Sequence, residues 1–393
     1  MGTLSGLTVI EMAGLGPAPF CAMMLADLGA RVIRIERQEA RDSQYNVLLR
    51  NRESIVIDAK KPEGRDLVLD LIEKADILIE GFRPGVMERL GLGPDKCLEQ
   101  NPRLVYGRMT GWGQEGPLAR TAGHDINYIS LAGVTHSMSR PGERPRHPLN
   151  LVGDYGGGGM LLAYGLMAGV WEAQRTGMGQ VIDCAMVDGA STLLAECYTF
   201  SAQGKFQGDP GTHLLDGGAH FYNCYETLDR KYVSVGPLEA KFYTEFLSRL
   251  GIDDPGWLDQ YDEDQWPVRR EQLAALFKQR TRDEWCALLD SAEVCFAPVL
   301  AFAEVADNPH IKARRTLIEI DGVVQPAPSP RFSRTASAVP HPARLPGQDT
   351  RAILAGFGYE DDRISGLFDN GVVNGPAMEG QSQSHHSTAG ARQ

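Results

Sequence analysis

Residues 7–36 read LTVIEMAGLGPAPFCAMMLADLGARVIRIE, and this stretch decides the fold. Apolar residues dominate 7–12 and 31–36, and both runs have the length of buried strands. Between them, apolar side chains recur at helical spacing from Phe20 to Leu28. A strand, a helix and a second strand in this order form a β-α-β unit with parallel strands. The opening of the chain therefore predicts an α/β fold.

The same alternation continues to residue 186. Apolar runs at 54–57, 76–79, 104–109 and 181–186 predict further strands, and the apolar positions of 67–75 share one helical face. Strands that alternate with helices form parallel sheets covered by helices. We therefore expect a Rossmann-like large domain built on a parallel sheet.

The composition changes after residue 198. Residues 204–218 are rich in Gly, Asp and polar side chains, as in a linker, and 221–236 alternate like a β-hairpin. Helical patterns follow at 240–250 and 270–289, the second broken near Thr281. The predicted organisation is a large domain at 1–198, a linker at 199–218, a smaller α+β domain at 219–300, a return linker at 301–330, the C-terminal part of the large domain at 331–369, and a disordered tail at 370–393.

Composition excludes several classes of function. The net charge of -12 argues against nucleic acid as the main partner. The longest apolar run, 160–171, is too short for a bilayer, which needs about 20 residues, so we expect a tightly packed buried helix there. Seven scattered cysteines without C-x-x-C spacing predict no metal site and reduced thiols. With no signal-peptide pattern at the N-terminus, we expect a cytoplasmic protein that binds no membrane.

The turn Gly14-Leu-Gly16-Pro-Ala-Pro19 resembles part of a dinucleotide-binding fingerprint, with Glu36 as its acidic residue. However, Pro19 stands where the third glycine permits close helix packing, and Arg37 follows the acid directly. These departures favour a glycine-rich turn that the fold needs for steric reasons over an NAD site.

A set of basic residues falls at predicted strand ends and in the loops that follow. Parallel sheets place ligand crevices there, and a pyrophosphate or 3′-phosphate would find charge-assisted donors. Solvated surface charge would explain about half of the set. Its members are Arg34, Arg37, Arg50, Arg52, Lys60, Lys61, Arg83 and Arg89.

Two titratable residues, His124 and Asp154, each precede an apolar helical run. Free backbone N–H groups at such helix starts would point into one cleft. Removing a proton from a weakly acidic C–H needs a base near the operating pH and fixed dipoles for the enolate oxygen, and inversion needs a second base on the other face. The alternative is structural, with His124 as a helix cap and Asp154 as a partner of the glycine-rich loop.

With several further motifs, these segments closely resemble the alpha-methylacyl-CoA racemases of the family III CoA-transferase superfamily. The resemblance runs from about Leu4 to Arg334, and agreement across so many segments favours the catalytic interpretation of His124 and Asp154. Its most specific motifs are Arg50-Asn-Arg52, residues 80–85, 108–117, 123–128 and 149–154, then 215–218, Val235-Gly236 with Glu239, 297–299, 308–310 and 330–335.

The resemblance implies roles for individual residues. His124 would serve one face of the α-carbon and Asp154 the other, Glu239 would orient the imidazole, and the Asp125 N–H would hold the enolate oxygen. Phe82 stands where relatives carry tyrosine, and Ile57 where they carry a small residue, which affects the expected adenine-side packing. CoA would bind Arg37, Ile57, Asp58, Ala59, Lys60, Gly81, Phe82, Arg83, Arg89, Gly123, Asp125, Ile126, Asn127 and Tyr128.

The resemblance also implies an assembly and a reaction. Two subunits would interlock as a homodimer, the large domain of one meeting the small domain of its partner, so that Glu239 comes from the other subunit. The substrate would be a 2-methylacyl-CoA whose configuration is inverted, and CoA would be part of that substrate, with no separate cofactor. Apart from the resemblance, flexible thioether side chains suit the lining of an apolar path for the acyl chain, and we expect some of seven methionines to line it and most to lie in the core. They are Met12, Met23, Met24, Met109, Met160, Met167 and Met186.

Two alternatives stay open at this point. In a family III CoA-transferase, Asp154 would attack the thioester as a nucleophile and form an anhydride. His124 favours the racemase, because a transferase needs no base there and one base cannot invert a stereocentre efficiently. A non-catalytic nucleotide-binding or regulatory protein would need neither residue.

Overall fold

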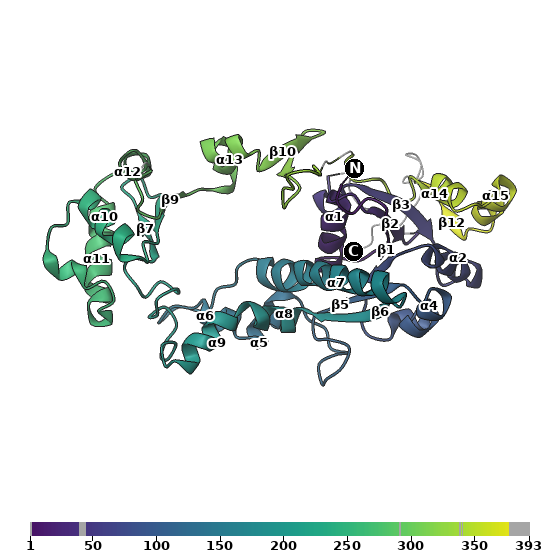
Figure 1. Cartoon of the computed structure of the whole chain (residues 1–393), viewed down its shortest axis with the longest axis horizontal. Coiled ribbons are helices and arrows are strands. Elements are labelled where there is room, and N and C mark those ends of the chain that lie inside the picture. Colours follow the sequence, from purple (N-terminus) through teal and green to yellow (C-terminus); the bar gives the residue numbers. More distant parts are fainter. Residues whose placement is uncertain (1, 39–44, 291, 338, 340, 377–393) are drawn as a thin grey trace, which may run out of the picture. The chain divides into compact units, whose positions relative to one another are not determined.

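The computed structural model describes residues 2–38, 45–290, 292–337, 339 and 341–376 (Figure 1). The chain forms two compact units. Of the described residues, the first unit contains those within 2–132, 149–193 and 317–376, and the second unit contains those within 133–148 and 194–316. These cuts differ from the domain boundaries expected from the sequence, because residues 133–148 group with the second unit. The expected boundaries stay a prediction.

Within its described residues, the first unit is built on a seven-stranded sheet of order β12-β3-β2-β1-β4-β5-β6. All neighbours are parallel except β12, which pairs antiparallel with β3. The parallel sheet expected from the sequence is confirmed, each predicted strand lying within two residues of its place. The strands are β1 (Thr8–Met12), β2 (Arg31–Glu36), β3 (Arg52–Ile57), β4 (Ile77–Glu80), β5 (Val105–Thr110), β6 (Gln180–Ala185) and β12 (Val373–Asn374).

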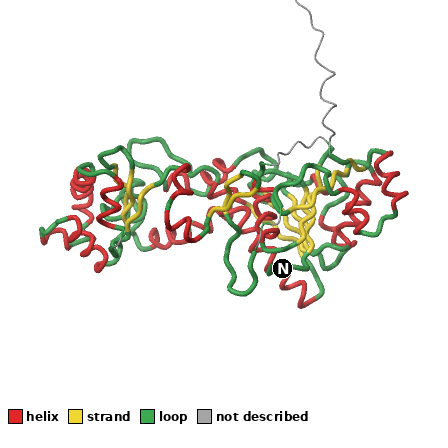
Figure 2. Tube along the Cα trace, turned by 90° about the horizontal axis from the view of Figure 1, so that it is seen from above, coloured by secondary structure: helices red, strands yellow, loops and turns green. Residues whose placement is uncertain are grey.

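Helices cover both faces of this sheet (Figures 1 and 2). One apolar core lies with α2, α4, α14 and α15, and the other with α1 and α7. The helical segments of the first unit are α1 (Pro17–Asp27), η1 (Val47–Leu49), α2 (Pro62–Glu73), α3 (Val86–Arg89), α4 (Pro94–Gln100), α5 (Asp125–Leu131), η2 (Leu151–Met160), α7 (Leu161–Thr176), α8 (Met186–Leu193), α14 (Thr350–Gly356) and α15 (Asp361–Asp369). A separate hairpin pairs β10 (Leu317–Ile320) with β11 (Val323–Pro326).

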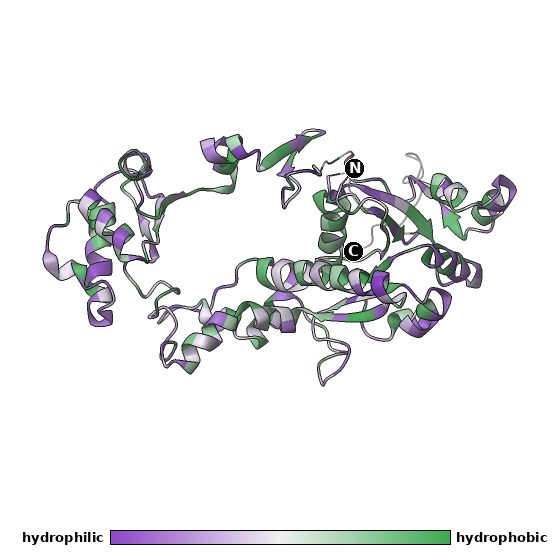
Figure 3. Cartoon of the chain, viewed as in Figure 1, coloured by the Kyte–Doolittle hydropathy of each residue, from purple (hydrophilic) through white to green (hydrophobic). Residues whose placement is uncertain are grey.

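The inner strands are rich in apolar residues because both of their faces are buried. Successive residues point to opposite sides of a strand. Val9 therefore packs in one core and Ile10 in the other, and Ile77 and Leu78 divide in the same way. Colouring by hydropathy shows the strands of this sheet as largely hydrophobic (Figure 3).

Part of the basic set proves to be structural. Arg34 Nη1 donates to Glu11 Oε1 at 2.6 Å, and Arg52 Nε lies 2.6 Å from Glu11 Oε2. Arg50 Nη2 pairs with Asp27 Oδ2 at 2.5 Å. All five side chains are buried. Each of these arginines is paired with a buried carboxylate, and removing one partner of such a pair costs about 3–5 kcal/mol. Of the three, which we expected in a ligand crevice, only Arg34 also lines the cavity described below.

The second unit packs helices around a three-stranded antiparallel sheet, β7-β8-β9, and an aromatic core. The predicted hairpin and the helix at 240–250 are confirmed, and Thr281 and Glu284 form the predicted capping box. Its elements are β7 (Asn223–Glu226), β8 (Tyr232–Val235), β9 (Phe296–Val299), α6 (Val134–Ser137), α9 (Ala195–Ala202), α10 (Ala240–Leu250), η3 (Pro255–Leu258), η4 (Glu263–Gln265), α11 (Trp266–Phe277), α12 (Arg282–Leu289), η5 (Phe302–Asp307) and α13 (Pro309–Arg314).

Two expectations need correction. Helix α7 is not buried all round: Tyr164 is 74% exposed and Trp171 65% exposed, so only one side of it packs on the sheet. Ordered structure also continues past Asn370, because the apolar residues Val372 and Val373 are buried where β12 adds to the sheet. The remainder of the expected tail, 377–393, lies outside the described residues.

Candidate active site

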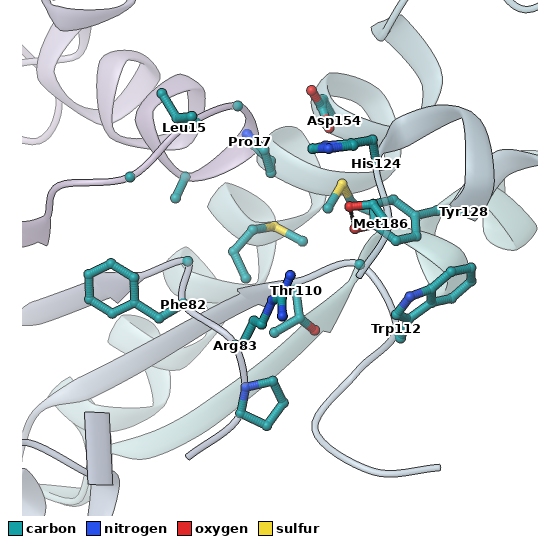
Figure 4. Close-up of a pocket in the computed structure, with 18 of the residues that line it drawn as sticks. Leu15, Pro17, Phe82, Arg83, Thr110, Trp112, His124, Tyr128, Asp154 and Met186 are labelled. Carbon is teal, nitrogen blue, oxygen red and sulfur yellow. Dashed lines mark hydrogen bonds between the residues drawn. The ribbon is translucent and has the colours of Figure 1, made fainter. Parts of the chain in front are cut away.

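A cavity of about 770 Å³ lies in the first unit, where strands β1, β4 and β5 end (Figure 4). Residues 13–18 follow β1, 81–84 follow β4, and 109–112 end β5, so all three segments meet at the same edge of the sheet. Open parallel sheets bind ligands at this edge. The side chains of His124 and Asp154 both line the cavity.

His124 is the N-cap residue of α5. Its backbone is extended (φ −134°, ψ 173°), its N–H donates to Asn127 Oδ1 at 3.0 Å, and its carbonyl accepts from the Asn127 N–H at 2.8 Å. The helix start expected here is confirmed. Because the backbone and Asn127 make these cap bonds, the exposed imidazole is directed into the cavity beside Asp154 (Figure 4).

Asp154 lies in η2, a π-helical segment rather than the ordinary helix start that we expected. Its N–H is not free, because it donates to Asp125 Oδ2 at 2.7 Å. Asn150 Nδ2 donates to Asp154 Oδ2 at 3.0 Å. Partial burial, together with the nearby Asp125 charge, raises the pKa of the Asp154 carboxyl above its usual value, although the Asn150 bond and His124 oppose the shift. The carboxyl therefore holds a proton more readily than an exposed aspartate does.

Glycines let η2, which carries Asp154, lie close to its neighbouring segments. A Cβ on Gly153 would lie 2.4 Å from Asp125 Oδ2, and one on Gly16 would lie 3.2 Å from Asp154 Oδ2. On the other side of η2, a Cβ on Gly189 of α8 would meet the Gly157 carbonyl at 1.9 Å. The position of Asp154 thus depends on contacts that only glycine permits.

Aromatic side chains form the wall next to His124. The Tyr128 hydroxyl donates to the Gly123 carbonyl, and the Tyr128 and Trp112 rings meet edge to face with centroids 4.7 Å apart. A Cβ on Gly111 would overlap the Tyr128 ring. This packing fixes the segment that leads into α5.

A second wall of the cavity carries the cationic side chains of Arg37 and Arg83. We call these two residues, together with Phe82, the cation wall. Arg37 and Arg83 are exposed, and the Arg37 guanidinium carbon lies 5.4 Å from the centre of the Phe82 ring. All three residues line the cavity. The cavity therefore combines an acid–base pair with a cationic surface.

The sequence profile of CoA-transferase family III matches residues 4–350. The chain belongs to this family. It is 40% identical to "Alpha-methylacyl-CoA racemase" of Homo sapiens over 94% of this chain and 97% of that protein, and 38% identical to the Mus musculus protein of the same name over 96% and 99%. The crystal structure of a CAIB/BAIF family protein from Brucella suis matches with a TM-score of 0.77 and 27% identity, over 91% and 99%. The family expected from the sequence is confirmed.

Within this family III chain, the predicted site residues fall into four groups. His124, Asp154, Arg37, Gly81, Phe82, Arg83, Gly123 and Tyr128 line the cavity. Asp125, Ile126 and Asn127 form the first turn of α5. Ile57 ends β3, Asp58, Ala59 and Lys60 follow it, and Arg89 ends α3; none of these residues is part of the lining. Glu239 belongs to the second unit, as the N-cap residue of α10. The functional roles of all these residues stay predictions.

The cavity also contains residues that sequence reasoning did not assign to it. Leu15 and Pro17 come from the turn after β1, and Thr110 and Trp112 from the end of β5. Their position in the sequence could have identified them, because each lies at or just after the end of a predicted strand of the parallel sheet. Met109 and Met186, two of the methionines expected near the acyl path, also line it.

Among the described residues, no helix is long and apolar enough to cross a membrane. In the same part of the chain, no three His, Cys, Asp or Glu side chains are grouped in a way that could hold a metal ion.

Proposed function

We propose that this chain is a racemase that interconverts (2R)- and (2S)-2-methylacyl-CoA thioesters by two-base proton transfer through an enolate. The observation that carries the proposal is the placement of His124 and Asp154 side by side in a cavity that also presents Arg37 and Arg83. The likeness to mammalian alpha-methylacyl-CoA racemases supports the same reaction.

The two bases have complementary tasks. When Asp154 is ionised it takes the α-proton, the C–H electron pair becomes the enolate, and protonated His124 returns a proton to the opposite face; the reverse direction exchanges their roles. A raised pKa suits Asp154, because an ordinary aspartate is too weak a base for a carbon acid. The Asp125 N–H lies in the first turn of α5, where backbone donors have no acceptor within the helix, and would stabilise the enolate oxygen.

The cation wall would bind the phosphates of CoA. Arg37 and Arg83 reach the cavity, and phosphate oxygens form charge-assisted hydrogen bonds with guanidinium groups. The predicted contacts at 57–60 and Arg89 would extend this binding outward. The proposed reaction requires no redox change, so CoA as part of the substrate suffices, with no further cofactor or metal.

The working form would be an interlocked homodimer that brings the partner's Glu239 toward His124. Large apolar side chains on the first unit, among them Tyr164 and Trp171 of α7, are exposed in the single chain. Patches of this kind mark protein interfaces. Mixing His124→Ala and Glu239→Gln subunits tests the arrangement: about a quarter of the activity returns if each site uses both chains, and none returns if each site lies within one chain.

We place this activity in the cytoplasm and in fatty-acid metabolism. All seven cysteines are free, which agrees with a reducing compartment. The flexible apolar side chains of Met109 and Met186 in the lining would pack against the acyl group of the substrate.

The deciding experiment incubates the protein with one enantiomer of a 2-methylacyl-CoA in deuterated water, with and without a free carboxylic acid as acceptor. We expect α-deuterium uptake together with epimerisation, both abolished by His124→Ala or Asp154→Asn. Acyl transfer to the added acid without α-exchange would instead make Asp154 the nucleophile of a CoA-transferase.

A further inference from the structure

The segment 81–84 brings much of the cation wall into the cavity. It follows β4 directly and lies outside helices and strands. Phe82, which supports the Arg37 guanidinium, and Arg83 both project from it. The position of the cations therefore depends on what holds this piece of backbone.

Glu80, the last residue of β4, holds segment 81–84 through a hydrogen bond. Its side chain is buried, with 0% of the residue exposed. Glu80 Oε2 accepts a hydrogen bond from the Phe82 N–H at 2.7 Å, and Oε1 accepts one from Arg108 Nε of β5 at 3.0 Å. Arg108 Nη1 in turn forms an ion pair with Glu88 Oε1 of α3 at 2.9 Å. One carboxylate thus ties the cavity segment to the neighbouring strand and helix.

This arrangement requires two acceptor oxygens on one side chain. A glutamine offers one oxygen and one NH₂ group, so either Phe82 N–H or Arg108 Nε would face a donor. A charge at this position is also unfavourable, since burial raises the pKa of Glu80 to about 6. Apolar residues of similar size usually stabilise a core as well as a buried ion pair does. The presence of a charged group next to segment 81–84 therefore points to a role in the site.

We propose that Glu80 is a positioning residue that sets the affinity for the CoA portion of the substrate through segment 81–84. Glu80 is not among the residues that line the cavity. The inference rests on the proposed function, because it takes Arg37 and Arg83 as the residues that bind CoA.

Glu80→Gln tests the proposal, with binding of CoA alone measured by calorimetry and racemisation measured as KM and kcat. We expect CoA affinity to fall and KM to rise by about tenfold, with kcat within threefold of wild type. The control is Glu53→Gln: Glu53 also accepts two hydrogen bonds in the same sheet, both from Arg31, but it lies at the opposite ends of the strands. We expect this control to leave KM and kcat unchanged.

Glu80→Asp is a second variant that keeps the charge near Arg108 but shortens the reach by one methylene, and it decides the matter if Glu80→Gln does not fold. A smaller rise in KM with kcat preserved supports the proposal. Wild-type CoA affinity in a folded variant overturns it, as does a loss of kcat with KM unchanged. A wild-type protein that does not bind CoA overturns the proposed function itself, which is a separate outcome.

Discussion

The two walls of the cavity are built in different ways. His124 and Asp154 are fixed by a helix cap, a π-helical segment and contacts that only glycine permits. Arg37 and Arg83 instead extend from segments that follow the strands β2 and β4. Proton transfer requires defined distances between donor and acceptor, whereas phosphate recognition tolerates movement of a long charged side chain. The comparison shows that the side chains held most firmly by the surrounding backbone are those that would break a C–H bond, and not those that would bind phosphate.

The largest expected effect comes from removing a base. His124→Ala or Asp154→Asn should lower kcat by about a thousandfold, because general acid–base catalysis contributes about 10² to 10⁴. Chiral analysis of the product CoA ester measures this, with circular dichroism to show that the variants fold. A variant that keeps full activity would remove the catalytic distinction between the walls.

A smaller loss is expected when the precise wall is disturbed without touching a base. Gly153→Ala places a methyl group 2.4 Å from Asp125 Oδ2 and should lower kcat by about a hundredfold, the cost of displacing a catalytic group by roughly 1 Å. Gly366→Ala in α15 is the control, since nothing lies within 4 Å of its Cβ. Equal activities of the two variants would show that the glycine contact does not fix Asp154.

The buried carboxyl of Glu80, which holds segment 81–84, should affect how the free energy of unfolding depends on pH. The pKa of Glu80 rises from 4.5 to about 6 on folding, so its stabilising contribution is complete below pH 4.5 and is lost as the pH rises through 6. Relative to Glu80→Gln, wild type should therefore lose about 2 kcal/mol of unfolding free energy over this range. Urea unfolding at several pH values measures the difference, and parallel pH curves would contradict it.

The smallest effect is expected at the cation wall itself. Arg83→Ala should raise KM about tenfold and leave kcat nearly unchanged, because it removes binding that is equal in ground and transition states. Steady-state kinetics at two salt concentrations would check this, since the wild-type advantage should shrink with ionic strength. A fall in kcat equal to the rise in KM would place Arg83 among the precisely held groups.

Sequence reasoning located the sheet and the pair His124 and Asp154, because hydrophobic periodicity and helix-start patterns are local signals. It did not predict the π-helix at 151–160, since its glycines show their purpose only against Asp125 and α8. Nor could it separate the buried Arg50 from the exposed Arg83. Both follow strands or turns in the sequence, and only the position of Asp27 in space distinguishes them.

The last strand of the sheet has a consequence for how the protein is made. β12 pairs with β3, and the Asp58 N–H donates to the Val372 carbonyl at 2.8 Å, although more than three hundred residues separate the two strands. A ribosome adds about 5 to 20 residues per second. The nascent sheet therefore keeps an open edge at β3 throughout synthesis of the second unit, and β12, which is made afterwards, closes it.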